Sequence, residues 1–476
     1  MNERYSDRLS TGQIFARRKV LQEGVCALAN EVAKLPRAAV EAPAPHALLY
    51  GGGIRDLFLG ERLRDADIQV YGVAPAVLEG LLNGLFPGNV ERVGKEYEIL
   101  KVTLSRADIL DVSIPRTNTA GVSKFEEGDP LLFPLLASRY RDFTINSMSL
   151  DPLTGIVYDP FDGRADLRAR RLRLVDEETF CLRGVHILRG CQFAARFGLT
   201  IEEGTARVMS ALSRSEAVER IPLNAVRKEL RKLLLEGKKP SSGIALLHRF
   251  ELLRRFFPAR VTAQKNADLT SWMTKLERGV QLGRACRLYP EHILIAQLAL
   301  LLSPLRKLAE GPRIEAVHQC LTALCFSGFQ RAAVAEILAR FNQVESLFVG
   351  APQRRVGSAR PHRGARRGWS EEESRTSTIL APIFVPRPAL ALSLAVFFAR
   401  PYEEMVSVCE HAEREGAEPA NGDPHALLNE ADVDALLGGQ SSPDVRERIL
   451  AELIAHRYEL VTRARACDYV RSISGQ

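Results

Sequence analysis

The sequence has 476 residues, of which 46% are hydrophobic and 26% charged, with a net charge of +7 and a pI near 9.0. Its longest apolar runs, such as PALALSLAVFFA, are shorter than the ~20 residues that span a bilayer, so we expect no membrane partner. The N-terminus is too polar for a secretory signal, and the eight cysteines form no CxxC motif and no His/Cys metal spacing. We therefore expect a cytoplasmic enzyme or RNA-binding protein, whose basic surface either attracts a polyanion or only keeps it soluble.

The first third of the chain mixes helix and strand patterns. Residues 14–35 have the periodicity of an amphipathic helix, and a Pro/Ala-rich spacer follows them. The stretch HALLYGGGIRDLFLG predicts a strand, a glycine turn and a helix, and residues 65–70 alternate like a half-buried strand. YEILKVTL and ADILDVSI predict two further strands. The pattern indicates an α/β domain over residues 46–165.

Beyond about residue 165 strand patterns almost disappear, and a 3.6-residue periodicity replaces them. AVRKELRKLLLEGKK has an apolar stripe backed by basic residues, with Gly237 as the expected C-cap. The stretch APQRRVGSARPHRGARRGWS has no such stripe and predicts a mobile basic connector. We divide the sequence into a helical N-terminal extension (1–45), an α/β domain (46–165), two helical segments (166–260 and 261–350), a basic flexible linker (351–380) and a helical tail (381–476).

The glycines at 51–53 stand before a pair of aspartates one residue apart. A dinucleotide-binding fingerprint is excluded, because the third glycine position counted from Gly51 is Asp56. A metal-dependent nucleotidyl transfer site fits better. Asp65 and Asp67 on one strand would face the same side, about 6.6 Å apart, where carboxylates suit Mg²⁺ and two metals can serve an in-line displacement. Glycines let backbone N–H groups approach a triphosphate.

A third carboxylate is expected on a neighbouring strand. Asp111 in ILDVS is the candidate, since Leu110 and Val112 would point to the opposite face. A carboxylate in such an apolar strand is costly unless a charged group receives it. The alternative is a surface strand with ordinary acids. The short DxD pattern alone favours that alternative, whereas the glycines upstream favour the metal site.

Several motifs together resemble one known family. In order and spacing, GGGIRDLFLG–RDAD, VGKEYEILKV, LDVSIPR, RDFTINSMSLDPLTG, YDPFDG and LRGCQFAARFGL resemble the class II tRNA nucleotidyltransferases and bacterial poly(A) polymerases over about residues 48–260. The resemblance implies a polymerase-β-type α/β head followed by an all-α neck, body and tail. Helices expected from about 425 to 470 resemble the family's RNA-binding tail more loosely.

The resemblance also implies residue roles and substrates. Gly52, Gly53 and Arg55 correspond to the triphosphate-binding motif. Asp65 and Asp67 correspond to the metal ligands of a two-metal Mg²⁺ site, and Asp111 to the third catalytic carboxylate. The nucleotide's ribose and phosphates would contact Arg141, Asp142 and Asn146, although this cluster could equally be a capped helix start with an exposed ion pair. The implied substrates are ATP and possibly CTP, and the implied partner is RNA, most of all the tRNA 3′ end.

Two stretches depart from the family pattern. Leu182-Arg183-Gly184-Val185-His186 stands where the family has Glu-Asp-x-x-Arg, which reads the base of the incoming nucleotide. Arg183 and His186 remain nucleotide-binding candidates, but this stretch offers almost only hydrogen-bond donors, so we expect weakened or changed nucleotide selection. The segment ILIAQLALLLSPLRK lacks the His-Asp pair of the family's phosphohydrolase module, so we expect no hydrolase activity from it.

Three hypotheses follow for function. The first is a template-independent RNA 3′-end nucleotidyltransferase, either CCA-adding or of the poly(A) type. The second is an RNA-binding protein of the same fold with lost or altered nucleotide selectivity. The third, transfer to a protein or small molecule, leaves the basic helical half without a role. The expected RNA-binding face, which could also be a solvated helix surface, comprises Lys228, Arg231, Lys232, Lys238 and Lys239. The sequence does not indicate an oligomeric state.

Overall fold

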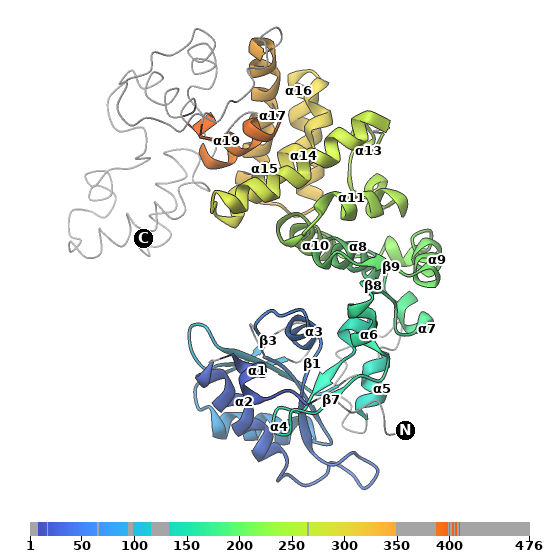
Figure 1. The fold of residues 1–476 in the computed structure, drawn as a ribbon, viewed down its shortest axis with the longest axis vertical. Helices are drawn as coiled ribbons and strands as arrows, with labels where there is room; N and C mark the ends of the chain where they lie inside the picture. Colours follow the sequence, from blue (N-terminus) through green and yellow to red (C-terminus); the bar gives the residue numbers. More distant parts are fainter. Residues whose placement is uncertain are drawn as a thin grey trace, which may run out of the picture. The chain divides into compact units, whose positions relative to one another are not determined.

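A computed structural model describes residues 8–16, 18–63, 66–93, 99–115, 133–263, 266–348 and 387–397, together with a few positions between 399 and 409. The chain divides into two compact units, residues 1–221 and 222–476 (Figure 1). Asp65, the predicted basic linker with Arg354 to Arg367, and the tail helices expected at 425–470 lie outside the described residues. Among the described helices none is long and apolar enough to cross a membrane.

Unit 1 is built on a seven-stranded mixed sheet with the order β3-β4-β5-β2-β1-β6-β7. Only β2 and β5 pair in parallel, and the other neighbours are antiparallel. The strands are β1 (His46–Tyr50), β2 (Ala66–Tyr71), β3 (Val90–Val93), β4 (Ile99–Thr103), β5 (Ile109–Ser113), β6 (Ser149–Leu150) and β7 (Val157–Tyr158). The predicted strands are therefore confirmed, with β2 described from Ala66 onward.

One face of this sheet is apolar, and the other carries the carboxylates together with a small buried cluster. Because side chains alternate along a strand, the register puts Ile68, Val70 and Val112 on one face, all fully buried. The helices α2 (Lys19–Val32) and α4 (Pro75–Leu85) pack together, and α2 also contacts β1, β2 and β5. The other face carries the alternate positions, including Asp67 and Asp111. This second face also carries Leu48 and Tyr71, which are buried in a cluster with Ala137.

The helices of unit 1 precede, interrupt and follow the sheet. The expected helix over 14–35 is two helices, because Ala16 adopts a left-handed conformation (φ 44°) that ends the first of them. The expected loss of strands beyond residue 165 is nearly complete where the structure describes the chain, since a single pair of two-residue strands follows there. The elements are α1 (Thr11–Phe15), α2 (Lys19–Val32), α3 (Gly52–Phe58), α4 (Pro75–Leu85), α5 (Pro134–Arg139), η2 (Thr144–Asn146), α6 (Gly163–Arg168), β8 (Arg171–Leu172), α7 (Glu177–Cys181), α8 (Val185–Phe197), β9 (Thr200–Ile201), α9 (Glu203–Leu212) and η3 (Glu216–Val218).

Unit 2 is helical throughout its described part. Its centre is α15, which is buried from Ile293 to Leu301 and contacts α10, α14, α17 and α19. Gly237 is the predicted C-cap of α10, and a Cβ there would lie 2.5 Å from the Leu233 carbonyl oxygen. The elements are α10 (Leu223–Glu236), α11 (Pro240–Arg249), α12 (Leu252–Phe256), α13 (Ala259–Thr262), α14 (Asn266–Ala285), α15 (Pro290–Leu301), η4 (Ser303–Lys307), α16 (Glu310–Ala323), α17 (Gly328–Phe348) and α19 (Arg387–Phe397). An α/β unit followed by helices confirms the predicted fold class.

Candidate functional site

Two of the three predicted carboxylates lie side by side on the second face of the sheet. Asp67 on β2 is the register partner of Asp111 on β5. Side chains of register partners on parallel strands point to the same face, and the strands are about 4.8 Å apart. Both residues are half-buried, and their chain neighbours Leu110 and Val112 point the other way into the core. Paired carboxylates on one face are a donor set that suits a hard divalent cation such as Mg²⁺.

Tyr50, which sequence reasoning missed, stands beside this pair at the end of β1. The Arg141 guanidinium lies 4.2 Å from the centre of its ring, and Arg141 and Ser113 both lower the pKa of its hydroxyl. Burial raises the pKa of Tyr50, Arg141 lowers it, and the nearby charge of Asp67 raises it further. The phenol is therefore neutral, and Arg141 stacks on a ring that lies close to Asp67. Its place at the end of a strand, directly before three glycines, was the available signal.

The glycine turn leads directly from β1 into α3. Gly51 has φ 73° and ψ −134°, a conformation open to glycine and costly for other residues. No side chain caps the N-terminus of α3, which is seven residues long. A Cβ at Gly52 would lie 3.2 Å from the Arg55 guanidinium. The turn thus brings backbone N–H groups and Arg55 together at the end of β1.

A buried polar network joins α3, η2 and α8. The Arg55 Nη1 donates to the Asn146 Oδ1 (2.6 Å), and the Asn146 Nδ2 donates to the Asp142 Oδ1 (2.9 Å). On its other side, Asp142 accepts from the Arg189 Nε (2.6 Å). Arg55, Asp142 and Asn146 are 4%, 6% and 5% exposed, which makes the network part of the core. The structure brings together three predicted residues and adds Arg189.

The charges of this network are balanced inside the protein. Burial alone would raise the pKa of Asp142, but Arg189, and then His186 and Asn146, lower it to about 2. Burial lowers the pKa of Arg55, which is partly offset by its ion pair with Asp56 at 2.7 Å. The guanidinium of Arg55 also lies 4.3 Å from the Phe197 ring centre. Loss of Arg189 would leave the Asp142 carboxylate without its ion-pair partner in the core.

The stretch that departs from the family pattern lies between α7 and α8. His186 is buried, and its Nδ1 lies 2.9 Å from the Phe180 carbonyl oxygen. Because a carbonyl only accepts, Nδ1 carries the hydrogen, and Nε2 of the neutral ring is a hydrogen-bond acceptor. Burial lowers the pKa of His186 from 6.5, which keeps the ring neutral near pH 7. The stretch Leu182 to His186 therefore has one hydrogen-bond acceptor, the His186 Nε2, beside the donors that the sequence predicts.

The predicted RNA-binding residues lie in unit 2. Lys228 and Arg231 are exposed on α10, and Lys238 and Lys239 are exposed between α10 and α11. Lys232 is half-buried and lies 4.0 Å from the Glu229 carboxylate. Among the described positions no three His, Cys, Asp or Glu side chains gather as a metal cluster. The predicted set Asp65, Asp67 and Asp111 includes one residue outside those positions.

The structure combines a mixed sheet that carries paired carboxylates on one face, a glycine turn that enters a helix, and a helical second unit. These features are typical of a nucleotidyltransferase fold followed by a helical body. The family model of the poly A polymerase head domain matches residues 47–173. A second model, the probable RNA and SrmB-binding site of polymerase A, matches residues 198–262. Through these segments the chain is similar to the class II family of CCA-adding enzymes and poly(A) polymerases.

Relatives and solved structures agree with this family. The Multifunctional CCA protein of Xanthomonas oryzae pv. oryzae is 33% identical over 214 residues, which are 44% of this chain and 50% of that protein. The match thus spans about half the length of the curated relative. A tRNA-processing enzyme in an apo form has the same fold, with a TM-score of 0.59, 15% identity, and coverage of 88% of this chain and 95% of the other. A CCA-adding enzyme in complex with ATP has a TM-score of 0.58, 18% identity, and coverage of 94% and 91%.

Proposed function

We propose that this protein is a template-independent nucleotidyltransferase that adds nucleotides to an RNA 3′ end, with tRNA as the main substrate. The observation that carries the proposal is the register pair of Asp67 and Asp111, on the same sheet face as Tyr50 and Arg141. The identity with a Multifunctional CCA protein supports the RNA substrate. The shared fold of CCA-adding enzymes solved with ATP and with CTP supports nucleoside triphosphates as the second substrate.

The residues would divide the work by position and charge. Asp65 and Asp67, with Asp111 as the third carboxylate, would hold Mg²⁺, which when bound supplies charge stabilisation to the transferring phosphoryl group. The turn at Gly51 and the N-terminus of α3 present backbone N–H groups to the triphosphate. Arg141, stacked on the Tyr50 ring close to Asp67, would donate to the phosphates of the nucleotide. The RNA 3′-hydroxyl would attack the α-phosphorus, its proton passing to solvent and pyrophosphate leaving, so positioning and electrostatics would carry most of the rate.

Nucleotide choice would depend on the stretch from Leu182 to His186. Adenine and cytosine both present an amino group, which an acceptor must receive. His186 Nε2 is an acceptor, whereas Arg183 offers only donors. One neutral acceptor gives less discrimination than a pair of carboxylates would, so we propose that selection for ATP and CTP over GTP and UTP is weakened, by about tenfold to a hundredfold.

The first prediction tests the carboxylate pair. In Asp67→Ala and in Asp111→Ala, incorporation of labelled nucleotides into tRNA lacking its 3′ end should fall by orders of magnitude, because each change removes a metal ligand. Affinity for tRNA should change little. The matched control is Glu91→Gln, which changes an exposed acid on the edge strand β3. Glu91 pairs in register with Lys101 on β4, and Lys101 pairs with Asp111 on β5. The variant should keep wild-type activity.

Incubation of the wild-type protein with Mg²⁺ and each labelled nucleotide in turn measures the nucleotide choice in the same assay. Near wild-type incorporation by Asp67→Ala would overturn the metal assignment. A strict selection of CTP and ATP would overturn the proposed effect of the altered stretch, without touching the assignment of the carboxylates.

A further inference from the structure

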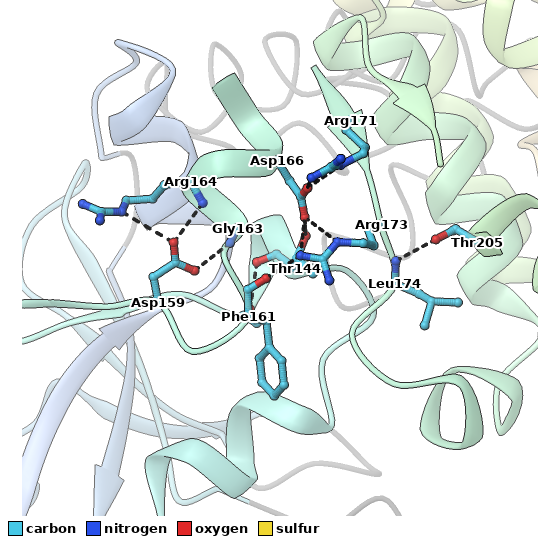
Figure 2. Close-up of polar contacts among 11 residues, drawn as sticks. Thr144, Asp159, Phe161, Gly163, Arg164, Asp166, Arg171, Arg173, Leu174 and Thr205 are labelled. Carbon is cyan, nitrogen blue, oxygen red and sulfur yellow. Dashed lines mark hydrogen bonds and ion pairs between the residues drawn. The ribbon is translucent and has the colours of Figure 1, made fainter. Parts of the chain in front are cut away.

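A buried carboxylate holds two arginines side by side where α6 meets β8 (Figure 2). Asp166 is fully buried, and its Oδ1 accepts from the Arg171 Nε at 2.6 Å. Its Oδ2 accepts from the Arg173 Nε at 3.0 Å and from the Thr144 Oγ1 at 2.7 Å. The Nη2 groups of the two arginines lie 2.6 and 2.9 Å from the same carboxylate. Both guanidinium groups are therefore fixed in orientation by one residue.

One carboxylate cannot neutralise two guanidinium groups, so the cluster keeps a positive charge. The side chains of Arg171 and Arg173 are 45% and 34% exposed, which leaves that charge in contact with solvent. Within the described part of the chain, the Nη1 group of each arginine makes no hydrogen bond. A pair of rigid guanidinium forks with free donors matches the geometry of a phosphate group.

The segment around the pair extends the positive charge. Residues 164–173 contain five arginines and one acid, which is Asp166 itself. Of these arginines, Arg168 and Arg170 are exposed, and Arg170 has φ 52°, in the left-handed region that costs a non-glycine residue free energy. Arg170 adopts a conformation that a glycine would adopt without strain. Along the chain these arginines form a short row of cations at the start of β8, in which Arg170 Nη1 also donates to the Phe197 carbonyl oxygen at 3.0 Å.

We propose that Arg171 and Arg173, with Arg168 and Arg170 beside them, bind the phosphate backbone of the RNA substrate. The proposal rests on the proposed function for its partner, and it adds an RNA contact in unit 1 outside residues 198–262, the segment that matches the RNA-binding family model. A row of several cations fits successive phosphates of a polyanion better than a single small anion. The contact is independent of base sequence, because only phosphates are read.

The pair could instead serve only as a clasp between α6, β8 and η2. Thr144 and Arg173 already hydrogen-bond to Asp166, and Arg173 Nη2 also donates to the Phe161 carbonyl oxygen at 2.7 Å. Arg171 is the more exposed of the two arginines, so it can be changed with Arg173 left on the carboxylate. A change of Arg171 therefore distinguishes a role of the arginine pair in RNA binding from a purely structural role.

The test is tRNA binding by the full-length protein without Mg²⁺ or nucleotide, measured by filter retention at several salt concentrations. In Arg171→Gln the affinity for tRNA should fall several-fold, and the slope of log affinity against log salt should decrease by about 1. Arg171→Lys should keep the slope. In Arg170→Gln, a change outside the Asp166 cluster, the slope should decrease as it does in Arg171→Gln. The charge-matched control is Arg37→Gln, an exposed residue after α2, which should bind like wild type.

Two results would overturn the proposal: wild-type affinity and slope in Arg171→Gln, or loss of ATP affinity in place of tRNA affinity. The second result would mean that the bound phosphate belongs to the nucleotide. The binding test needs no catalysis, so it can be judged apart from the proposed function. If the wild-type protein adds no nucleotide but Arg171→Gln weakens tRNA binding, the proposed function is wrong and the phosphate contact still holds. If the wild-type protein has no affinity for tRNA, the proposed phosphate contact is wrong.

Discussion

Asp142 is ionised in the core of unit 1 because three partners receive its charge. Arg189 contacts one carboxylate oxygen, and Asn146 and the Phe143 backbone N–H donate to the other. Burial raises the pKa of Asp142, and the partners together hold it at about 2. The charge is therefore present at every physiological pH, and the network that joins α3, η2 and α8 does not titrate there.

His186 does respond to pH. Burial lowers the pKa of His186 below its usual value of 6.5. When the pH falls below 6.5, His186 therefore takes up a proton in the unfolded chain before it does so in the folded chain. The free energy of unfolding should thus be highest above pH 6.5 and fall on acidification, by at most about 1.4 kcal/mol per pH unit for one histidine. We predict that His186→Gln flattens this decline between pH 7.5 and pH 5.5.

Urea-induced unfolding at the two pH values measures this prediction. His46→Gln, a histidine on β1 outside the cluster, controls for the loss of an imidazole. An unchanged decline in His186→Gln would mean that other groups cause the pH dependence.

At the scale of elements, η2 is the piece that connects the two polar clusters. It contacts α3 and α6, and its residues Thr144 and Asn146 hydrogen-bond to Asp166 and to Arg55. Such a short helix has little packing of its own, so its position depends on these neighbours. Gly163, at the start of α6, approaches it most closely, since a Cβ there would lie 2.3 Å from the Thr144 carbonyl oxygen.

We predict that Gly163→Ala destabilises the protein by about 1–3 kcal/mol, because backbone must move to admit the methyl group. Nucleotide addition should fall as well, since η2 carries Asn146. Gly80→Ala is the matched control. Gly80 is exposed on α4 with nothing within 4 Å of its Cβ position, so this change should stabilise by about 0.5–1 kcal/mol. Equal unfolding free energies for Gly163→Ala and the wild type would contradict the close approach.

At the scale of the whole molecule, the two units carry different parts of the proposed function. Unit 1 has its own sheet, the candidate site and the arginine row, and unit 2 has the exposed Lys228 and Arg231 on α10 and the exposed lysines that follow α10. The likeness of residues 198–262 to an RNA-binding family model crosses the boundary between the units. Binding of RNA should therefore draw on both units, and binding of nucleotide on unit 1 alone.

We predict that a chain ending at Ile221 keeps its affinity for ATP but loses most of its affinity for tRNA. The salt dependence of the remaining tRNA binding should also be weaker, because fewer phosphates are neutralised. Equilibrium binding of both ligands measures this. The full-length double variant Lys228→Gln/Arg231→Gln should show a smaller loss of the same kind. Full tRNA affinity in the shortened chain would exclude unit 2 from the RNA interface.

The sequence by itself determined the elements and the face that each residue takes, because alternation and helical periodicity are local properties of the chain. Asp111 faces away from Leu110 and Val112 as the pattern predicts, and Gly237 ends α10. The glycines at 51–53 do form a turn into a helix. The family resemblance gave the order of the motifs and is confirmed by the matching family models.

Only the tertiary structure decided which of these elements meet. The sequence placed Asp67 and Asp111 on two strands, but their parallel pairing in register depends on how the whole sheet assembles. Nothing local marks Arg189 as the partner of Asp142, 47 residues away, or identifies Phe180 as the carbonyl that fixes the His186 tautomer. Such contacts result from packing through space, where any arginine of suitable reach is an equal candidate until the backbone is placed.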